Sequence, residues 1–377
     1  RLQGHDARNT ALAILGRGIR EIVDLALAQN LRTVGMDIVE VANQVSADYL
    51  KTEDFARRPL AWLDLISRNP GTTLSYSPTF GYDICARRIS SQTKASERFD
   101  LSRWRVAGNG ADMIRPDVMQ SFVDAFHDAG FKASAFLPSY GLAEATLAVT
   151  IMPPGEGLIV ELVDEGELSG DPQPAGKPQR FRAIVNCGKP CRDMAVEIRD
   201  ADGTALPERA IGKVWASGPS IMHSYFRDDI STAACLKDGW LDTGDMGYMS
   251  EGYVFVVGRA KDMIIINGKN YWPQDIEWAV EQLPGFKAGD IAAFSVTAPN
   301  GEESPAVLVQ CRTTDPAERM ALRDAIREKV RSITGMNCIV ELVPPRTLPR
   351  TSSGKLSRAK AKKLYLAGEI EPYKLAA

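Results

Sequence analysis

Between about residue 45 and residue 153 the chain alternates helix-like and strand-like segments, and this alternation limits the folds it can adopt. Residues 58–67 read as a helix with a proline in its first turn. Residues 72–78 read as a strand that ends at a proline. Residues 104–107 read as a second strand, followed by a glycine turn and a helix that begins near Pro116. The pattern predicts an α/β domain whose open, largely parallel sheet is covered by helices.

The remaining segments predict two further architectures. Short strands separated by turn signals over residues 183–258 indicate a small antiparallel β-barrel or sandwich. After Lys261, a helix from Pro273, strands at 291–294 and 306–309, and an amphipathic helix over 316–333 indicate a smaller α+β domain. Residues 1–45 read as a separate unit, in which a helical stretch precedes a strand.

Composition excludes several classes of protein. The 377 residues carry a net charge of −3 with a pI near 5.8, which argues against a protein that mainly binds nucleic acid or anionic membrane. The longest apolar runs, such as 263–266, are strand-sized, so we expect no transmembrane segment. Six cysteines in a chain of this size do not form a disulfide framework, which favours the reducing cytoplasm. Cys187 and Cys191 are expected to be buried, inert thiols and not zinc ligands.

Two side chains near residue 140 fit a site for a metal-bound nucleotide. Glu144 follows a strand-to-turn segment, where a hard carboxylate can hold Mg²⁺. Tyr140 offers a flat face and a hydroxyl, and like Asn109 it stands at the carboxyl end of a predicted strand, where ligands of such sheets bind. The alternative is that Tyr140 is a core residue and Glu144 an acidic residue at a helix N-terminus.

Asp245 and Arg259 add complementary chemistry. A carboxylate at Asp245, after a strand that runs into a glycine turn, can accept hydrogen bonds from both ribose hydroxyls. Arg259 would supply a fixed cationic fork for ribose or phosphate. The alternative for Asp245 is an ordinary hairpin aspartate that binds local backbone amides.

Lys355 lies on a glycine turn between hydroxyl and arginine side chains. A Walker loop is excluded, because that motif requires glycine at Pro349 and Ser or Thr at Leu356. The basic tail around Lys355 can also be interpreted as a solvated or nucleic-acid-binding surface, which the mildly acidic chain disfavours.

Five motifs in this order, at residues 109–112, 140–146, 242–245, 258–262 and 349–358, resemble those of the adenylate-forming ligases. Residues 77–83, 140–146 and 265–277 look specifically like the fatty acyl-AMP ligase branch. The resemblance implies that Lys355 is the main catalytic cation and that Glu144 is the Mg²⁺ ligand. It also implies nucleotide contacts from Asn109, Gly110, Ala111, Tyr140, Gly141, Asp245 and Arg259. Lys261 matches the hinge about which the small domain rotates, and Asp112 stands where the family usually has glutamate.

The resemblance implies an enzyme that activates a fatty acid with ATP and Mg²⁺, giving an acyl-adenylate and pyrophosphate. The acyl group would pass to the phosphopantetheine of an acyl carrier protein, or of a carrier domain in a polyketide or peptide synthase. The expected divisions are 1–45 outside the family, 46–186 from the large adenylation domain with an insertion at about 150–182, 187–261 barrel-like, and 262–377 a mobile C-terminal domain. The insertion disfavours transfer to coenzyme A.

The family's Ser/Thr/Gly-rich phosphate loop is not found in the sequence. Residues 71–75 do not replace it, because they lack the repeated glycines that expose backbone amides. An alternative is therefore a truncated remnant that does not catalyse the reaction and acts at most as a binding module. The sequence leaves acyl chain length and the identity of the carrier protein open.

Overall fold

The computed structural model describes residues 31–34, 47–48, 50–89, 94–169, 181–266, 269–287, 289–297, 303–350 and 355–374. The chain forms two compact units. Unit 1 comprises residues 1–163 and 181–257, and unit 2 comprises residues 164–180 and 258–377. Of the helices in the described ranges, none combines the length and the apolarity needed to cross a bilayer.

The first sheet of unit 1 has seven strands in the order β2-β1-β3-β4-β5-β6-β9. The pairs from β2 to β5 are parallel, and β6 and β9 are added antiparallel. Its strands are β1 (Leu31–Val34), β2 (Ala47–Asp48), β3 (Thr72–Ser77), β4 (Trp104–Asn109), β5 (Phe136–Tyr140), β6 (Thr150–Ile151) and β9 (Lys189–Pro190). The predicted largely parallel sheet is thus confirmed.

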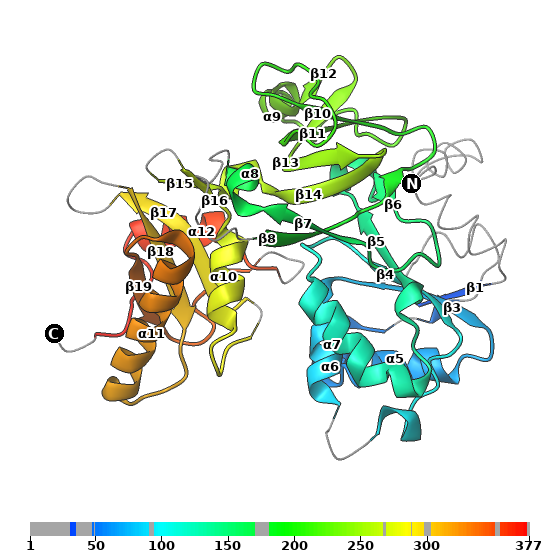
Figure 1. The fold of residues 1–377 in the computed structure, drawn as a ribbon, viewed down its shortest axis with the longest axis horizontal. Coiled ribbons are helices and arrows are strands. Elements are labelled where there is room, and N and C mark those ends of the chain that lie inside the picture. Colours follow the sequence, from blue (N-terminus) through cyan, green and yellow to red (C-terminus); the bar gives the residue numbers. More distant parts are fainter. Residues whose placement is uncertain are drawn as a thin grey trace. The chain divides into compact units, whose positions relative to one another are not determined.

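Helices pack on this sheet through an aromatic-rich core (Figure 1). The helices are α4 (Thr52–Arg57), α5 (Leu60–Arg68), α6 (Thr79–Arg88) and α7 (Pro116–Phe126). Trp62 from α5, Tyr82 from α6 and Phe122 from α7 meet Trp104 of β4 with ring centroids 5.2–6.2 Å apart. The edge-to-face arrangement of most of these pairs suits the aromatic quadrupole, so the helices are fixed against the strands that carry the polar residues described below.

Unit 1 also contains antiparallel strands, as predicted from the turn signals. A five-stranded sheet has the order β10-β11-β13-β12, with β14 paired to β13. These strands are β10 (Ala195–Arg199), β11 (Gly212–Ser217), β12 (Leu236–Lys237), β13 (Trp240–Ser250) and β14 (Tyr253–Arg259). A short helix, α9 (Asp229–Cys235), precedes β12, and β7 (Val160–Asp164) pairs with β8 (Phe181–Val185).

Unit 2 is an α+β structure around the sheet β17-β18-β19. Its strands are β15 (Ile264–Ile266), β16 (Lys269–Tyr271), β17 (Ile291–Thr297), β18 (Glu303–Gln310) and β19 (Ile339–Val343). Its helices are α8 (Glu165–Ser169), α10 (Pro273–Glu281), α11 (Pro316–Thr334) and α12 (Arg358–Leu366). The helices predicted from Pro273 and Pro316 are confirmed.

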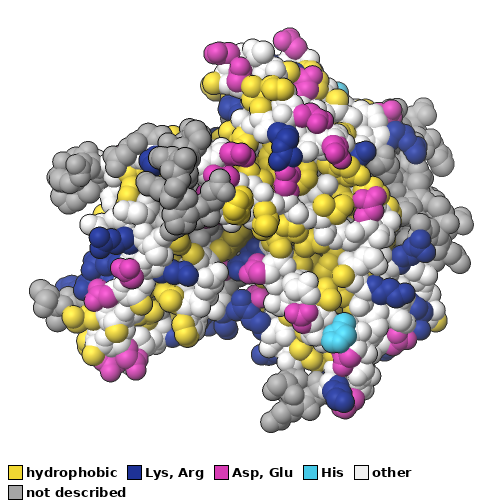
Figure 2. All heavy atoms as spheres, viewed as in Figure 1, with side chains coloured by type: hydrophobic (Ala, Val, Ile, Leu, Met, Phe, Trp, Pro, Cys, Tyr) yellow, Lys and Arg dark blue, Asp and Glu magenta, His cyan; other side chains and the backbone are white. Residues whose placement is uncertain are grey.

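Acidic and basic side chains are interspersed on the face drawn in Figure 2, in keeping with the small net charge. The helix predicted within residues 1–30 lies outside the described residues, as do residues 170–180 of the predicted insertion and residues 351–354 before Lys355. The division of the chain at residues 45, 186 and 261 stays a prediction.

Candidate functional site

Two residues selected from the sequence meet in unit 1. Tyr140, the last residue of β5, donates a hydrogen bond from its hydroxyl to Asp245 Oδ2 at 2.8 Å. Both side chains are more than nine-tenths buried, with 8% and 7% exposed. A buried carboxylate needs hydrogen-bond donors to offset its loss of water. The pair therefore anchors a polar group at the carboxyl end of a parallel strand, where ligands of such sheets bind.

A β-bulge places Asp245. Lys213 of β11 lies opposite Met246, whereas Trp215 lies opposite Asp242, so β13 carries extra residues between these positions. Gly244 takes a φ of +75° there, which glycine adopts without steric cost. The sequence predicted that the strand ends at a glycine turn; instead β13 continues to Ser250, because the bulge absorbs the glycine within the sheet.

The bulge is held by local hydrogen bonds. Thr243 Oγ1 donates to the Val214 carbonyl at 2.8 Å, and the Asp245 amide donates to Thr243 Oγ1 at 3.2 Å. The Gly244 amide donates to Asp242 Oδ1 at 3.0 Å. Bulges of this kind redirect a side chain, and here the backbone that carries Asp245 is fixed on both sides.

Asn109 is the last residue of β4, and Gly110 and Ala111 follow it. The Asn109 side chain is fully buried, and its amide nitrogen lies 2.9 Å from the Met119 sulfur on α7. A Cβ on Gly110 would lie 2.7 Å from Ser139 Oγ and 2.9 Å from the Ser139 carbonyl oxygen, so the turn passes close to β5. Ala111 has a φ of +65°. The side chain of Asn109 thus belongs to the core, Gly110 is buried as well, and Ala111 is exposed.

Glu144 lies on a 3₁₀ turn, Ala143–Ala145, that follows β5. Its Oε1 accepts a hydrogen bond from the Tyr225 hydroxyl at 2.7 Å, and its carbonyl accepts one from the Met222 amide at 2.7 Å. Nothing in the sequence around Tyr225 pointed to this contact, because the two residues are 81 positions apart. Only the fold could reveal it.

The donor set suits Mg²⁺ bound together with a nucleotide. In the described ranges no cluster of three His, Cys, Asp or Glu side chains could form a protein-only metal cage. Mg²⁺ is commonly held by one or two carboxylates, with phosphate oxygens and water completing its shell. A single carboxylate at Glu144 fits that mode, in which the phosphates supply the remaining ligands.

The other selected residues belong to unit 2. Arg259 ends β14 and Lys261 lies on the 3₁₀ turn Ala260–Asp262, and both side chains are exposed. Lys355 is half-buried. It lies next to Leu356, which forms an isolated antiparallel bridge with Arg350.

An ion-pair cluster fixes the chain directly after Lys355. Arg358 donates to Glu277 Oε1 and Oε2, both at 2.7 Å, and to Asp262 Oδ2 at 3.1 Å. Burial alone would lower the pKa of the Arg358 guanidinium, but attraction to Glu277 and then to Asp262 outweighs it and raises that pKa. Arg358 therefore stays charged and joins the turn that carries Lys261 to the segment that carries Lys355.

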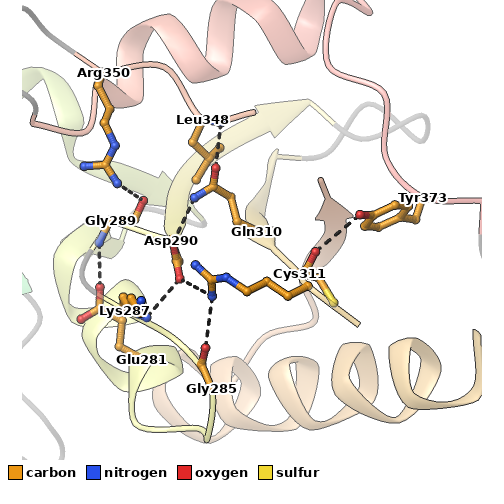
Figure 3. Close-up of polar contacts among 11 residues, drawn as sticks. Glu281, Gly285, Lys287, Gly289, Asp290, Gln310, Cys311, Leu348, Arg350 and Tyr373 are labelled. Atoms are coloured by element: carbon orange, nitrogen blue, oxygen red, sulfur yellow. Dashed lines mark hydrogen bonds and ion pairs between the residues drawn. The ribbon is translucent and has the colours of Figure 1, made fainter. Parts of the chain in front are cut away.

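A second network of polar contacts lies around Leu348 and Arg350 (Figure 3). Asp290, which is 4% exposed, accepts from Gln310 Nε2 at 3.0 Å and from Arg312 at 3.2 Å. Gln310 Oε1 in turn accepts from the Leu348 amide at 3.3 Å, and Arg350 donates to the Gly289 carbonyl at 3.2 Å. The chain is therefore anchored within unit 2 at Leu348 and Arg350, and again at Arg358.

Residues 46–226 match the family model described as "AMP-binding enzyme". The chain is 46% identical over 354 residues to a putative acyl-CoA synthetase of Caulobacter vibrioides, covering 93% of this chain and 61% of the relative. It is 32% identical over 339 residues to the medium-chain-fatty-acid–[acyl-carrier-protein] ligase JamA of Moorena producens, covering 85% of this chain and 56% of the relative.

A solved structure from work on fatty acyl-adenylate ligases of E. coli and L. pneumophila superimposes with a TM-score of 0.82 at 40% sequence identity. The match covers 90% of this chain and 62% of that structure. The chain thus spans between 56% and 62% of the length of these three proteins.

Proposed function

The chain belongs to the AMP-binding enzyme family, and from this premise we propose that it takes part in forming a fatty acyl-adenylate from a fatty acid and ATP. In this reaction a carboxylate oxygen of the fatty acid attacks the α-phosphorus of ATP. The bond from that phosphorus to the bridging oxygen breaks, and pyrophosphate leaves with the electron pair. The observation that supports the proposal most strongly is the buried Tyr140–Asp245 pair at the carboxyl end of β5.

In unit 1 we assign the nucleoside to the strand ends. Asp245 would accept the ribose hydroxyls, because each carboxylate oxygen has lone pairs beyond the one that Tyr140 occupies. The turn of Asn109, Gly110 and Ala111 would contact adenine through its backbone, since the Asn109 side chain is buried against Met119. Gly141, in the turn between Tyr140 and Glu144, would contact the nucleotide through its backbone.

Charge neutralisation is assigned to Glu144 and to unit 2. Glu144 would hold Mg²⁺, which as a Lewis acid neutralises charge that develops on the phosphate oxygens. Lys355 would pair with carboxylate and phosphate oxygens in the transition state. Arg259 would contact ribose or phosphate. Lys261 would be the hinge about which the small domain rotates between the two half-reactions.

The acceptor of the acyl group is the finer part of the proposal. We propose the phosphopantetheine thiol of a carrier protein, whose sulfur would attack the acyl carbonyl and release AMP. The name of the Moorena relative, a ligase acting on acyl carrier protein, and the polar segment at about 150–182 support this acceptor. The name of the Caulobacter relative, a putative acyl-CoA synthetase, supports coenzyme A as the competing acceptor. Incubating preformed acyl-adenylate with holo-carrier protein or with coenzyme A separates the two.

The adenylation step is tested by ATP–pyrophosphate exchange with a panel of fatty acids. We expect exchange that depends on the acid and that falls by about two to three orders of magnitude in Lys355→Ala, the usual loss for a cation that stabilises transition-state charge. Lys360→Ala is the matched control, because Lys360 is an exposed lysine on α12. No exchange by folded protein that still binds AMP would instead favour a binding module.

Nucleoside binding is tested separately, by calorimetric titration with AMP. Replacing Asp245 with Asn keeps an acceptor for Tyr140 but removes the charge. Losing a charge-assisted hydrogen bond costs about 1.5–3 kcal/mol, so the affinity for AMP should fall by about 10- to 150-fold. Asp238→Asn, at an exposed turn, should leave the affinity unchanged. Equal affinity in both variants would contradict the assignment of Asp245 to ribose.

A further inference from the structure

Tyr225 forms a hydrogen bond with Glu144, although no sequence pattern had assigned this tyrosine a role. Its hydroxyl donates to Glu144 Oε1 at 2.7 Å. Two more hydrogen bonds join the same stretches of chain: the Met222 amide to the Glu144 carbonyl at 2.7 Å, and Thr146 Oγ1 to the Ser220 carbonyl at 2.9 Å. Three contacts between residues 144–146 and 220–225 make this a fixed junction and not a chance surface approach.

The Tyr225 side chain is itself held in place. It is partly buried, and its backbone amide donates to Thr232 Oγ1 at 2.9 Å, on helix α9. Helix α9 begins at Asp229, where the Asp228 side chain caps it by accepting from the Ser231 amide at 2.9 Å. The backbone that carries the Tyr225 phenol is therefore held by helix α9.

The chemistry of the two groups sets the direction of this hydrogen bond. A carboxylate that holds a metal has no proton to donate, so the Tyr225 hydroxyl donates and Glu144 accepts. Within the described part of the chain, the hydrogen bond from Tyr225 uses Oε1 of Glu144, and Oε2 is the oxygen left for a ligand.

We propose that Tyr225 is a positioning residue that holds the Glu144 carboxylate so that its second oxygen is presented to Mg²⁺. The inference rests on the role of Glu144 in the proposed function. Carboxylates that bind metals are commonly hydrogen-bonded by a neighbouring group that fixes their orientation, and losing that group weakens metal binding about 10- to 100-fold. A tyrosine with no such role would be replaceable by phenylalanine without effect on the metal.

The chain contains a matched control for this bond. Tyr248 donates its hydroxyl to Glu161 Oε2 at 2.8 Å, which is also a tyrosine–glutamate hydrogen bond in unit 1. Tyr225→Phe and Tyr248→Phe therefore each delete one hydroxyl of the same chemistry. Both variants keep the aromatic ring, and circular dichroism establishes that both are folded.

The test is a titration of the full chain with Mn²⁺, a paramagnetic substitute for Mg²⁺, at saturating ATP, followed by water-proton relaxation. We expect Tyr225→Phe to weaken protein-bound Mn²⁺ by about tenfold or more. Tyr248→Phe should stay within about twofold of the wild type, and Glu144→Gln should lose the relaxation enhancement. A higher Mn²⁺ concentration should restore the relaxation enhancement in Tyr225→Phe, whose site is only weakened, but not in Glu144→Gln, which lacks the ligand.

Three results would overturn the inference. If Tyr225→Phe binds Mn²⁺ as the wild type does while Glu144→Gln does not, Tyr225 has no positioning role and the proposed function stands. If Glu144→Gln binds Mn²⁺ normally, the metal lies elsewhere and the inference fails, whereas AMP binding and pyrophosphate exchange still report on adenylation. If the wild type shows no enhancement and binds no AMP, both proposals fail together.

Discussion

At the scale of single residues, Gly141 shows how closely the turn after β5 is packed. A Cβ at this position would lie 1.5 Å from the Leu147 carbonyl oxygen, a distance that no side chain can tolerate. The turn can therefore pass from Tyr140 to Glu144 only with glycine at position 141. Any larger residue at position 141 would displace the backbone of the turn, so the substitution would also move Tyr140 and Glu144.

The cysteines allow a prediction at the same scale. The structure confirms that Cys187 and Cys191 are buried, and burial raises the pKa of the Cys85 and Cys187 thiols to about 12 and that of Cys338 to about 11. Because the thiolate is the reactive form, iodoacetamide at about pH 8 should modify half-buried Cys235 at least about tenfold faster than Cys85 or Cys187.

Peptide mass spectrometry measures each labelling rate in that experiment. In urea the buried cysteines should react as fast as Cys235, because unfolding removes the burial. Rapid labelling of Cys187 in the folded chain would show that the packing around it is open.

At the scale of elements, the segment around Lys355 depends on contacts that reach across unit 2. Arg358 at the start of α12 binds Glu277 of α10 and Asp262 of the 3₁₀ turn after β14. The Glu277 side chain is only 4% exposed, so water could hardly solvate its charge if Arg358 were removed. The ion-pair cluster thus joins three elements that local sequence would leave separate.

Arg358→Ala should lower the free energy of unfolding by about 3–5 kcal/mol, because it leaves the buried carboxylate of Glu277 uncompensated. The double variant Arg358→Ala, Glu277→Met should recover much of this loss, since it removes the buried charge as well. Urea denaturation measures both. Arg87→Ala, which breaks an exposed pair with Asp83, is the control and should cost about 0.3–0.5 kcal/mol.

Glu341 of β19 provides a pH-dependent prediction. Burial raises the pKa of its carboxyl, and the hydrogen bond from Tyr365 and the charges of Arg327 and Arg323 offset this only in part. The folded state therefore favours protonated Glu341. This contribution to stability is complete below the ordinary pKa of glutamate and is lost as the pH rises through the raised, folded-state value.

Glutamine at position 341 does not ionise, so the Glu341→Gln variant does not lose this stability as the pH rises. Its free energy of unfolding relative to the wild type should therefore increase between about pH 4 and pH 7. Urea denaturation across that range measures the trend, with exposed Glu369→Gln as the control. A constant difference between variant and wild type would show that Glu341 titrates alike in the folded and unfolded chains.

At the scale of the whole molecule, each unit has hydrophobic cores of its own. The two cores of unit 2 draw on residues between Ile264 and Tyr373, and they lie on the two faces of the β17-β18-β19 sheet. Leu348, Ala361 and Ile370 belong to the second of these cores. Independent cores are the usual property of domains that fold alone.

Residues 258–377 should therefore fold as an isolated fragment with cooperative unfolding in urea, as far-ultraviolet circular dichroism would show. A matched fragment of residues 258–345 lacks Leu348, Ala361 and Ile370, so we expect it to lose cooperativity. Failure of the longer fragment to fold would mean that residues 164–180, which belong to the same unit, are required.

Local sequence patterns predicted many of the elements and the residue types of the candidate site. Helices from Pro273 and Pro316 and the strand that ends before Pro78 were predictable, because periodicity and proline act locally. The motifs that contain Asp245 and Lys355 were also among those that indicated the family. Their roles in the reaction stay predictions, to be settled by the nucleotide and exchange experiments.

Which side chains meet depends on the three-dimensional fold. Tyr140 and Asp245 are 105 residues apart, and Tyr225 and Glu144 are 81 apart. A local pattern cannot specify such pairs, because they depend on strand order, on the bulge in β13 and on the junction between residues 144–146 and 220–225. The bulge was mistaken for a turn for the same reason: glycine at positive φ suits both, and only pairing with β11 distinguishes them.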